Sequence, residues 1–448
     1  MAKLFGTDGV RGLANIELSP LLALQLGTAA AHVIVERKKD ARILIGRDPR
    51  ISGDILESAM VAGVCSQGLD AVMVGVISTP GVAYLTATTG ASAGVVISAS
   101  HNPVNDNGIK FFGPDGFKLD DSVEESIEEY VPGFDELARP RGADVGRMFR
   151  RHELVWEYAH HVKEASPQRL DGLKVVMDCA NGAASELAPQ IFSELGAEVH
   201  SINCDPNGIN INSDCGSMHP ETLRVKVKEI GAVIGLAFDG DADRVIMIDE
   251  RGEIVDGDHV MAIYGLWRAR RGDLPQRMVV GTVMSNIGLE LALAKENVKL
   301  ARTPVGDRYV CDEMRRSGAI VGGEKSGHII LSRYTTTGDG MITALQVISI
   351  MLESGRRLSD LASEMEEFPQ VLLNVRVKER DGWDGVPSIT SAIASAETKL
   401  AGRGRILVRP SGTEKLIRVM AEGPDGDEIG RLAEDVADAI RGSLGDGK

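Results

Sequence analysis

Three segments of the chain follow one plan: a short apolar strand, a loop of small residues, an amphipathic helix, and a Gly or Asn before a second strand. They run from Ile43 to Gly75, from Lys174 to Asn203 and from Met278 to Pro304. Strands that alternate with helices are typical of largely parallel or mixed sheets with helices on both faces. The repeat therefore predicts three related α/β domains.

The pattern changes after Pro369. Strands are predicted near 371–377, 406–408 and 416–421, with one helix near 388–400 and another at the end of the chain. These elements predict a smaller α+β domain. A chain of 448 residues is long enough for three or four domains, at roughly 150 residues each. We place the domains at 1–150, 151–255, 256–369 and 370–448, with the first linker in the Pro- and Gly-rich stretch 132–146.

Composition and charge exclude several classes of function. Hydrophobic residues make up 43% of the chain and charged residues 25%, which is typical of a globular protein. The formal net charge of −16 argues against a nucleic-acid partner, so any anion site must be a local cationic pocket. The five cysteines include no Cys-x-x-Cys pair and indicate reduced thiols. The apolar stretches Leu21–Val35 and Met341–Leu352 are too short or too interrupted to span a membrane. We expect a cytoplasmic protein without a membrane partner.

The stretch from Val95 to Phe112 contains the first candidate site. An apolar strand leads into a loop with Ser98, Ser100 and His101, and Lys110 follows about ten residues later. The two serines are two residues apart, so we expect strand alternation to let only one of them point away from the strand end. A serine on a strand-end loop near a cation and a histidine suits covalent group transfer. For this loop alone, a polar turn is an equal alternative.

Asp239, Asp241 and Asp243 alternate along the second candidate loop. Three close anions repel one another unless a cation is present, so the spacing predicts a metal site, with Mg²⁺ favoured if the chemistry involves phosphate. An EF-hand is a poor alternative because Arg244 occupies the position of its required glycine and a strand follows. A haloacid-dehalogenase-type motif would need Thr or Val in place of Asp243.

The third loop, Gly322 to His328, combines two glycines with polar side chains. Glu324 is a bidentate acceptor suited to neighbouring hydroxyl groups, Ser326 adds a hydrogen bond, and His328 can carry a proton. Here too, a polar turn is the alternative.

The fourth loop, Leu407 to Met420, has the composition of a phosphate site. It presents backbone N–H groups and two hydroxyls between two arginines, an arrangement that suits a phosphate dianion. The residues concerned are Arg409, Ser411, Gly412, Thr413 and Arg418. A Ser-Gly turn between strands is the alternative. Another basic loop, Phe5–Gly12, contains Arg11.

The four loops, in this order and spread over nearly the whole chain, resemble those of the α-D-phosphohexomutase superfamily. SASHNP is similar to its phosphoserine loop, DGDADR to its metal loop, GEKSGH to its sugar-binding loop and RPSGTE to its phosphate-binding loop. Within the superfamily, FGTDGVRG, SASHNPVNDNGIKFFG and SGTEKLIRVM are most similar to the bacterial phosphoglucosamine mutases. Lys325 stands where that branch would have Gln. Phosphomannomutase/phosphoglucomutase activity is the alternative.

This resemblance implies three related mixed-sheet α/β domains and a C-terminal α+β domain around a central cleft. It implies a phosphoserine at Ser100, one Mg²⁺ per chain and a hexosamine 1,6-bisphosphate as activator and intermediate, in the conversion of glucosamine 6-phosphate to glucosamine 1-phosphate for UDP-N-acetylglucosamine synthesis. The implied metal ligands are Ser100, Asp239, Asp241 and Asp243. The implied catalytic residues are Ser100, Arg11, His101, Lys110 and His328, with the general base unassigned. Substrate would be bound by Arg244, Glu324, Ser326, Arg409, Ser411, Gly412, Thr413 and Arg418. A homodimer is left open.

Overall fold

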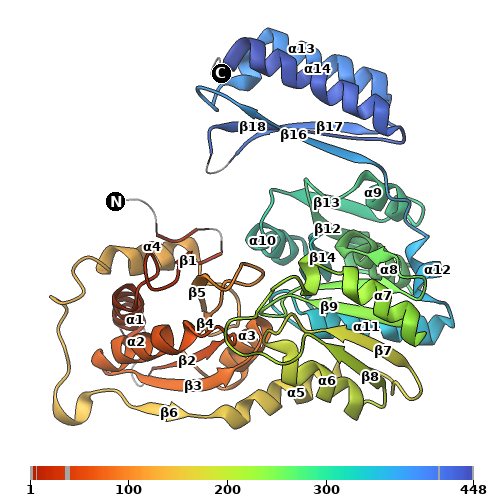
Figure 1. Cartoon of the computed structure of the whole chain (residues 1–448). Helices are drawn as coiled ribbons and strands as arrows, with labels where there is room; N and C mark the ends of the chain where they lie inside the picture. The colour runs from red at the N-terminus through yellow and green to blue at the C-terminus, as the bar shows by residue number, and fades with distance from the viewer. Residues whose placement is uncertain (1–3, 7, 36–40, 412–413, 446–448) are drawn as a thin grey trace. The chain divides into compact units, whose positions relative to one another are not determined.

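The computed structural model describes residues 4–6, 8–35, 41–411 and 414–445. Its first sheet is mixed and has the strand order β1-β5-β4-β2-β3-β6 (Figure 1). The strands are β1 (Val10–Leu13), β2 (Arg42–Arg47), β3 (Asp70–Val76), β4 (Ala93–Ile97), β5 (Asp106–Phe112) and β6 (Met148–Arg150). Strand β2 is parallel to β3 and β4, whereas β5 runs antiparallel to β4 and β1. The Pro- and Gly-rich stretch 132–146 precedes β6, which is still part of this sheet.

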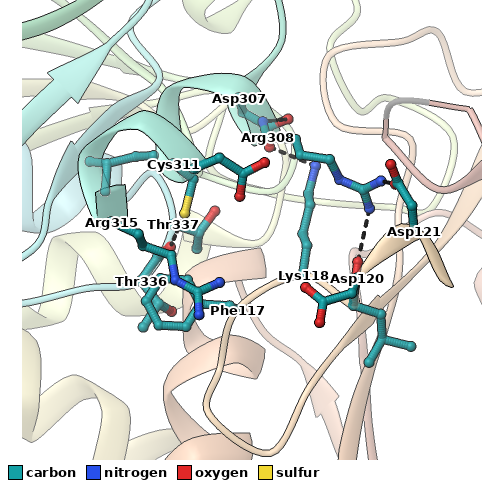
Figure 2. A pocket seen from close by; sticks show the side chains of 13 residues that line it. Phe117, Lys118, Asp120, Asp121, Asp307, Arg308, Cys311, Arg315, Thr336 and Thr337 are labelled. Carbon is teal, nitrogen blue, oxygen red and sulfur yellow. Dashed lines mark hydrogen bonds and ion pairs between the residues drawn. The ribbon is translucent and has the colours of Figure 1, made fainter. Parts of the chain in front are cut away.

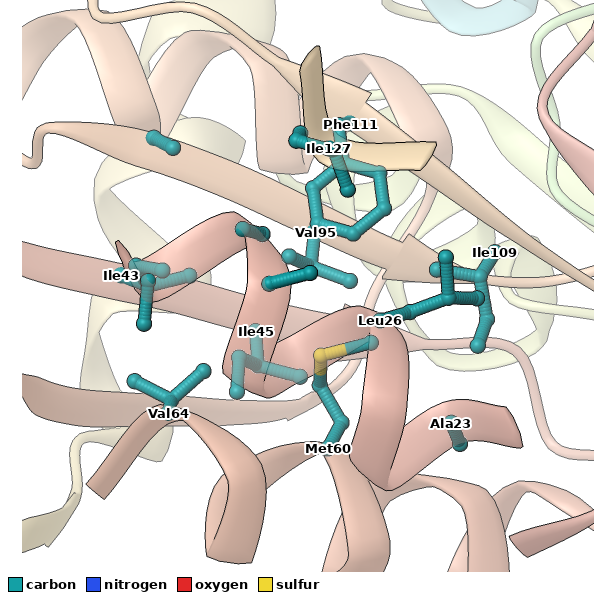
Figure 3. Packing of buried hydrophobic residues seen from close by; sticks show 14 of the residues in the cluster. Ala23, Leu26, Ile43, Ile45, Met60, Val64, Val95, Ile109, Phe111 and Ile127 are labelled. Carbon is teal, nitrogen blue, oxygen red and sulfur yellow. The ribbon is translucent and has the colours of Figure 1, made fainter. Parts of the chain in front are cut away.

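Four helices accompany the first sheet: α1 (Pro20–Val35), α2 (Gly53–Ser66), α3 (Thr79–Thr88) and α4 (Asp121–Tyr130). The core between α1, α2 and the sheet consists mainly of aliphatic side chains, together with the rings of Phe5 and Phe111, and Figure 3 shows part of it. Leu26 and Met60 come from the helices, and Ile45, Val95 and Phe111 from the strands. Full burial of such a side chain stabilises the fold by about 1.5–3 kcal/mol. This core fixes β4 and β5, which carry the first candidate loop.

The second domain contains a mixed five-stranded sheet in the order β11-β10-β9-β7-β8. The strands are β7 (Lys174–Asp178), β8 (Glu198–Ile202), β9 (Ile234–Phe238), β10 (Val245–Asp249) and β11 (Ile254–Val255). Its helices are α5 (Val155–Glu164), α6 (Ala184–Glu194) and α7 (Glu221–Ile230). Strands β9 and β10 are antiparallel, and the turn between them carries the three aspartates. Both strands are fully buried, so the turn is held by rigid elements.

The third domain has a mixed four-stranded sheet in the order β13-β12-β14-β15. The strands are β12 (Met278–Thr282), β13 (Lys299–Thr303), β14 (Val321–Gly323) and β15 (Ile329–Leu331). Its helices are α8 (Gly257–Arg270), α10 (Asp307–Ser317), α11 (Gly340–Ser354) and α12 (Leu358–Ala362). The antiparallel pair β14 and β15 is joined by the third candidate loop. Short 3-10 helices occur at Gly142–Asp144, His152–Leu154, Gly216–Met218, Pro275–Arg277 and Trp383–Gly385.

The C-terminal domain is an antiparallel three-stranded sheet with two helices side by side on one face (Figure 1). Its elements are β16 (Gln370–Arg376), α13 (Pro387–Leu400), β17 (Arg405–Pro410), β18 (Leu416–Glu422) and α14 (Gly426–Leu444). Together with 285–297, which includes α9 (Ile287–Ala294), it forms one compact unit; Met1–Met284 and Val298–Glu364 form the other.

The predicted fold class of three mixed-sheet α/β domains and a C-terminal α+β domain is confirmed. The predicted strands and helices of the C-terminal domain also occur in the predicted order. In the described part of the chain, every helix is too short or too polar to cross a membrane.

Candidate active site

Ser100 lies in the loop that follows β4 and has an unusual backbone conformation. Its φ of 52° falls in the left-handed region, which is unfavourable for a residue other than glycine. The side chain is buried, and its Oγ donates a hydrogen bond to Asp239 Oδ2 at 2.6 Å. His101 Nδ1 lies 3.2 Å from the same Oγ. The loop thus aims one hydroxyl group at the aspartate turn of the second domain.

A fully buried arginine holds this loop in place. Arg50 donates from Nη2 to the carbonyl oxygens of Ser100, at 3.0 Å, and Asn102, at 2.7 Å, and from Nη1 to that of Pro103. Its Nε donates to Asp48 Oδ2 at 2.9 Å. Three loop carbonyls therefore share one guanidinium group, which offsets the strain at Ser100 with several charge-assisted hydrogen bonds.

Ser98 and Ser100 have different roles in the geometry. Ser98 is fully buried; its Oγ donates to Asp48 Oδ2 at 2.6 Å and accepts the Ser100 N–H at 3.0 Å. The expectation that strand alternation separates the two serines was wrong in its reason, because residues two apart in a strand point to the same face, and both serines lie beyond the end of β4 at Ile97. Hydrogen bonds to Asp48 and Asp239 distinguish them instead.

Sequence reasoning missed several residues that support the site. Asn212 of the second domain donates from Nδ2 to the carbonyls of Ser100, at 2.8 Å, and Asn102, at 3.0 Å. Thr79, at the start of α3, donates from Oγ1 to Asp241 Oδ2 at 2.6 Å. Asp48 and Arg50 follow the apolar strand β2 directly, so their place on a strand-end loop was an available signal. Asn212 lies in an irregular loop and gave none.

The three aspartates form the one cluster of metal-ligating side chains found among the described residues. Asp239, Asp241 and Asp243 are buried, and one oxygen of each lies within 4.8 Å of the others. Asp241 Oδ1 and Asp243 Oδ1 are buried and accept no hydrogen bond. Carboxylate oxygens of this kind are the ligands that Mg²⁺ and Ca²⁺ prefer. The cluster therefore fits a divalent cation.

The charges around the cluster differ from one aspartate to the next. Burial raises the pKa of Asp239 well above its usual value, and the neighbouring carboxylates of Asp241 and Asp243 add to this rise. Burial also opposes ionisation of Asp243, but His328 and Lys110 outweigh it and lower the pKa of Asp243. The repulsion among the three carboxylates is thus only partly balanced by the neighbouring cations of the protein, such as His328 and Lys110.

Of two predicted catalytic cations, Lys110 lies beside the cluster, and Arg11 shares the partner Asp8 with it. Lys110, on β5, is buried with its Nζ 3.4 Å from Asp241 Oδ2 and 3.1 Å from Asp8 Oδ2. Burial opposes its charge, but Asp8 and Asp241 outweigh burial and raise the pKa of Lys110. Arg11, on β1, also pairs with Asp8, and its Nη1 donates to Asn102 Oδ1 at 3.4 Å. Asp8 therefore contacts both cations, and the sequence analysis did not single it out.

The two predicted histidines are in opposite environments. Burial lowers the pKa of His101 to about 4, and the nearby cations of Arg244 and Arg11 contribute to the shift. His328 Nδ1 lies 3.5 Å from Asp243 Oδ1. Burial opposes a charge on His328, as does the Gly338 N–H directed at its Nε2 at 3.1 Å. The charge of Asp243 prevails and raises the pKa of His328 to about 9.

The third loop is joined to the aspartate turn through the backbone. Val245 N–H, just after the turn, donates to the carbonyl of Gly327 at 3.2 Å, and Arg244 and His328 form an isolated β-bridge. Glu324 Oε1 accepts the Gly306 N–H at 3.0 Å, and its Oε2 accepts a long hydrogen bond of 3.4 Å from Ser326 Oγ. The structure thus brings together loops from the first three domains.

The fourth loop belongs to the C-terminal unit. Arg409 on β17 and Arg418 on β18 are directly opposite each other, and like charges in such a pair are unfavourable. Burial and the charge of Arg418 lower the pKa of Arg409. Ser411 Oγ accepts the Glu414 N–H at 3.3 Å, while Gly412 and Thr413 lie outside the described residues. A bound anion would relieve the repulsion between the two arginines.

The geometry predicts that the protein binds a divalent cation through its buried aspartates. Asp241→Asn should weaken Mn²⁺ or Mg²⁺ binding by about tenfold or more. Loss of a residue that only supports a metal ligand already lowers affinity by about tenfold, so loss of a direct ligand should cost at least as much. Asp171→Asn, a change in an exposed ion pair with Arg169, is the control. Isothermal titration of the metal-free protein measures both affinities. Equal affinities for Asp241→Asn and wild type would contradict the site.

Comparison with known proteins places the fold and these loops in a family. Four domain models of the phosphoglucomutase/phosphomannomutase family match this chain. Alpha/beta/alpha domain I matches residues 2–137, domain II residues 156–252, domain III residues 256–368 and the C-terminal domain residues 372–439. The matches together cover most of the chain and occur in the family's own order.

Individual relatives agree with this result. A protein of Moorella thermoacetica named phosphoglucosamine mutase is 55% identical over 430 residues, covering 96% of this chain and 97% of the relative. The crystal structure of a phosphoglucomutase/phosphomannomutase family protein from Burkholderia thailandensis has a TM-score of 0.83 at 23% identity, over 98% of this chain and 97% of that one. N-acetylphosphoglucosamine mutase of Aspergillus fumigatus, solved with GlcNAc-6P and magnesium, has a TM-score of 0.68 at 18% identity, over 98% and 95% of the two chains. The chain belongs to the phosphoglucomutase/phosphomannomutase family.

Proposed function

We propose that this chain interconverts glucosamine 6-phosphate and glucosamine 1-phosphate through a phosphoserine at Ser100. The observation that carries the proposal is the 2.6 Å hydrogen bond from Ser100 Oγ to Asp239, which sets a serine hydroxyl against a cluster of buried carboxylates. The full-length similarity to proteins named phosphoglucosamine mutase supports the choice of substrate. The reaction would operate in the cytoplasm and feed UDP-N-acetylglucosamine synthesis.

One Mg²⁺ per chain fits the site, held by Asp239, Asp241, Asp243 and the Ser100 side chain. The two buried carboxylate oxygens that accept no hydrogen bond, on Asp241 and Asp243, support this assignment. When bound, the cation would neutralise charge on the phosphoryl group during transfer. Thr79 binds the aspartate turn through Asp241, and Arg50 binds the serine loop through the Ser100 carbonyl. Both residues thereby help to hold the two loops in place.

The phosphate on Ser100 would pass to the free hydroxyl of the sugar at one end, giving a hexosamine 1,6-bisphosphate. In this step the sugar hydroxyl loses its proton as its oxygen bonds to phosphorus, the bond from phosphorus to Ser100 Oγ breaks, and the released serine oxygen takes up a proton. The intermediate then turns end over end, and its other phosphate returns to Ser100. Lys110, Arg11, His101 and His328 surround this position and would stabilise charge or carry the proton.

Substrate recognition would be divided between two further loops. Glu324 and Ser326 would accept and donate hydrogen bonds to sugar hydroxyls, with Arg244 close to them. The non-reacting phosphate would be held by the fourth loop, namely Arg409, Ser411, Gly412, Thr413 and Arg418. The opposed arginines on β17 and β18 support this role, because an anion would relieve their repulsion. The domain bounds 1–150, 151–255, 256–369 and 370–448 belong to the same proposal.

A change of sugar within the same chemistry is the second candidate. Lys325, in the sugar-binding loop, lies with its Nζ 3.5 Å from Asp256 Oδ2 and is the residue that departs from the expected motif. Phosphomannomutase/phosphoglucomutase activity would leave every phosphoryl-transfer residue in the same role.

The substrate prediction is tested by a direct comparison of sugars. On the phosphorylated protein, kcat/KM should be at least about tenfold higher for glucosamine 6-phosphate than for mannose 6-phosphate or glucose 6-phosphate, because a site that pairs the amino group discriminates against a hydroxyl in its place. Coupled assays under identical Mg²⁺ concentrations measure the three values. A preference for mannose or glucose phosphate would favour the second candidate, and no turnover with any sugar would reject both.

The nucleophile is tested by two serine variants. Ser100→Ala should fall below about 0.1% of wild-type turnover, since the covalent route is lost. Ser98→Ala should keep about a tenth of the activity, because it loses one backbone-supporting hydrogen bond but no reacting group. Intact mass after incubation with a hexose 1,6-bisphosphate should show one added phosphate in Ser98→Ala and none in Ser100→Ala. The reverse pattern would show that Ser98 is the nucleophile.

The fourth loop is tested by removing one arginine. The held phosphate is unchanged throughout the reaction, so its contacts contribute equally to ground-state and transition-state binding. Arg418→Ala should therefore weaken substrate binding by about 2 kcal/mol, raise KM more than it lowers kcat, and release free 1,6-bisphosphate. Lys415→Ala, on the same hairpin, is the control. An unchanged KM without bisphosphate release would show that this loop does not hold the distal phosphate.

A further inference from the structure

Lys118 connects two domains at the edge of the active site. It lies between β5 and α4, and its side chain is 14% exposed. Its Nζ donates to Asp8 Oδ1 at 2.7 Å and lies 2.6 Å from Asp307 Oδ2. Asp8 precedes β1 of the first domain, whereas Asp307 is the first residue of α10 in the third. One ammonium group thus bridges two carboxylates from separate domains.

Each of these carboxylates contacts a residue with a proposed catalytic role. The second oxygen of Asp8, Oδ2, lies 3.1 Å from Lys110 Nζ and also pairs with Arg11. Asp307 Oδ2 lies 4.0 Å from His328 Nε2, which is beyond hydrogen-bond distance, so Asp307 acts on His328 through its charge. The chain of charged groups therefore runs from Lys110 through Asp8, Lys118 and Asp307 to His328.

We infer that Lys118 is a positioning residue, which through Asp8 fixes Lys110 and Arg11 and through Asp307 fixes His328. The inference rests on the proposed function, since it assigns Lys118 to the same phosphoryl-transfer site. Without this ammonium group, Asp8 would keep Lys110 and Arg11 as partners, but the largely buried Asp307 would keep only the more distant His328 among these groups, which is unfavourable. The two carboxylates would separate or draw in the remaining cations, and Lys110 would lose its position beside Asp241. A misplacement of this size affects the transfer step more than substrate binding.

The neighbouring Arg308 provides a matched control. It also lines the cavity of about 220 Å³ between α10 and the first domain, and Figure 2 shows it reaching toward Asp121 while Lys118 reaches toward Asp307. Arg308 Nη2 lies 3.0 Å from Glu124 Oε2 and donates to the Leu119 carbonyl at 3.0 Å. None of these three partners has a role in the proposed reaction. A residue that only joined the domains would therefore behave as Arg308 does.

The test compares Lys118→Met with Arg308→Met in the full-length protein. Lys118→Met should lower kcat at least about 20-fold, within the range for a displaced catalytic group, while KM stays within about threefold. Arg308→Met should lower the melting temperature but keep kcat within about twofold. The double variant Lys118→Met, Asp8→Asn should lower kcat by less than the product of the two single reductions, because both changes remove the same Lys118–Asp8 contact. Wild-type kcat in Lys118→Met, or equal losses in the two Met variants, would overturn the inference.

A second measurement does not depend on turnover. Acetylation of Lys110 by acetic anhydride, followed by peptide mass spectrometry, should be about threefold faster or more in Lys118→Met than in wild type, because Lys110 loses its local protection. Arg308→Met should leave this rate unchanged. If Lys118→Met does not fold, Asp307→Asn tests the same link and should also lower kcat without raising KM. An unchanged acetylation rate rejects the inference, whereas an inactive wild-type enzyme with the expected acetylation pattern rejects only the proposed function.

Discussion

The repulsion among three buried carboxylates is the constraint on which the rest of the site depends. Asp239, Asp241 and Asp243 lie on one turn between two fully buried strands, so they cannot move apart. The protein supplies Lys110 and His328 as partial compensation. Burial still holds the pKa of Asp239 far above its usual value. A divalent cation would complete the balance, and the turn is rigid enough to select for one.

A second constraint is the left-handed backbone of Ser100. The conformation is unfavourable by itself, and it persists because Arg50 and Asn212 bind the loop carbonyls from two different domains. The same conformation brings Ser100 Oγ within 2.6 Å of Asp239. Backbone strain, a buried guanidinium group and the nucleophile's orientation are therefore parts of one arrangement.

The site also explains why the fold repeats one kind of domain. Each of the first three sheets ends in a loop, and the contacts between these loops are backbone hydrogen bonds, buried ion pairs and side-chain bonds to carbonyl oxygens. Rigid strands on either side limit how far each loop can move. Reacting groups that must be held to within a fraction of an ångström are better placed this way than on one long flexible loop.

The sequence by itself determined the number and class of the domains, because the alternation of strands and helices is a local pattern that repeats. Short polar motifs after apolar strands also marked the serine loop, the three aspartates and His328 as candidates, and the resemblance to the phosphohexomutases selected Ser100 and Lys110. The sequence did not identify Asp8, Asp48, Arg50, Asn212 or Lys118. Their contacts join residues about 50 to more than 180 positions apart, such as Arg50 with Asn102 and Lys118 with Asp307. Only the tertiary structure decided those partners, since charge pairing between distant segments depends on how the sheets pack and not on local pattern.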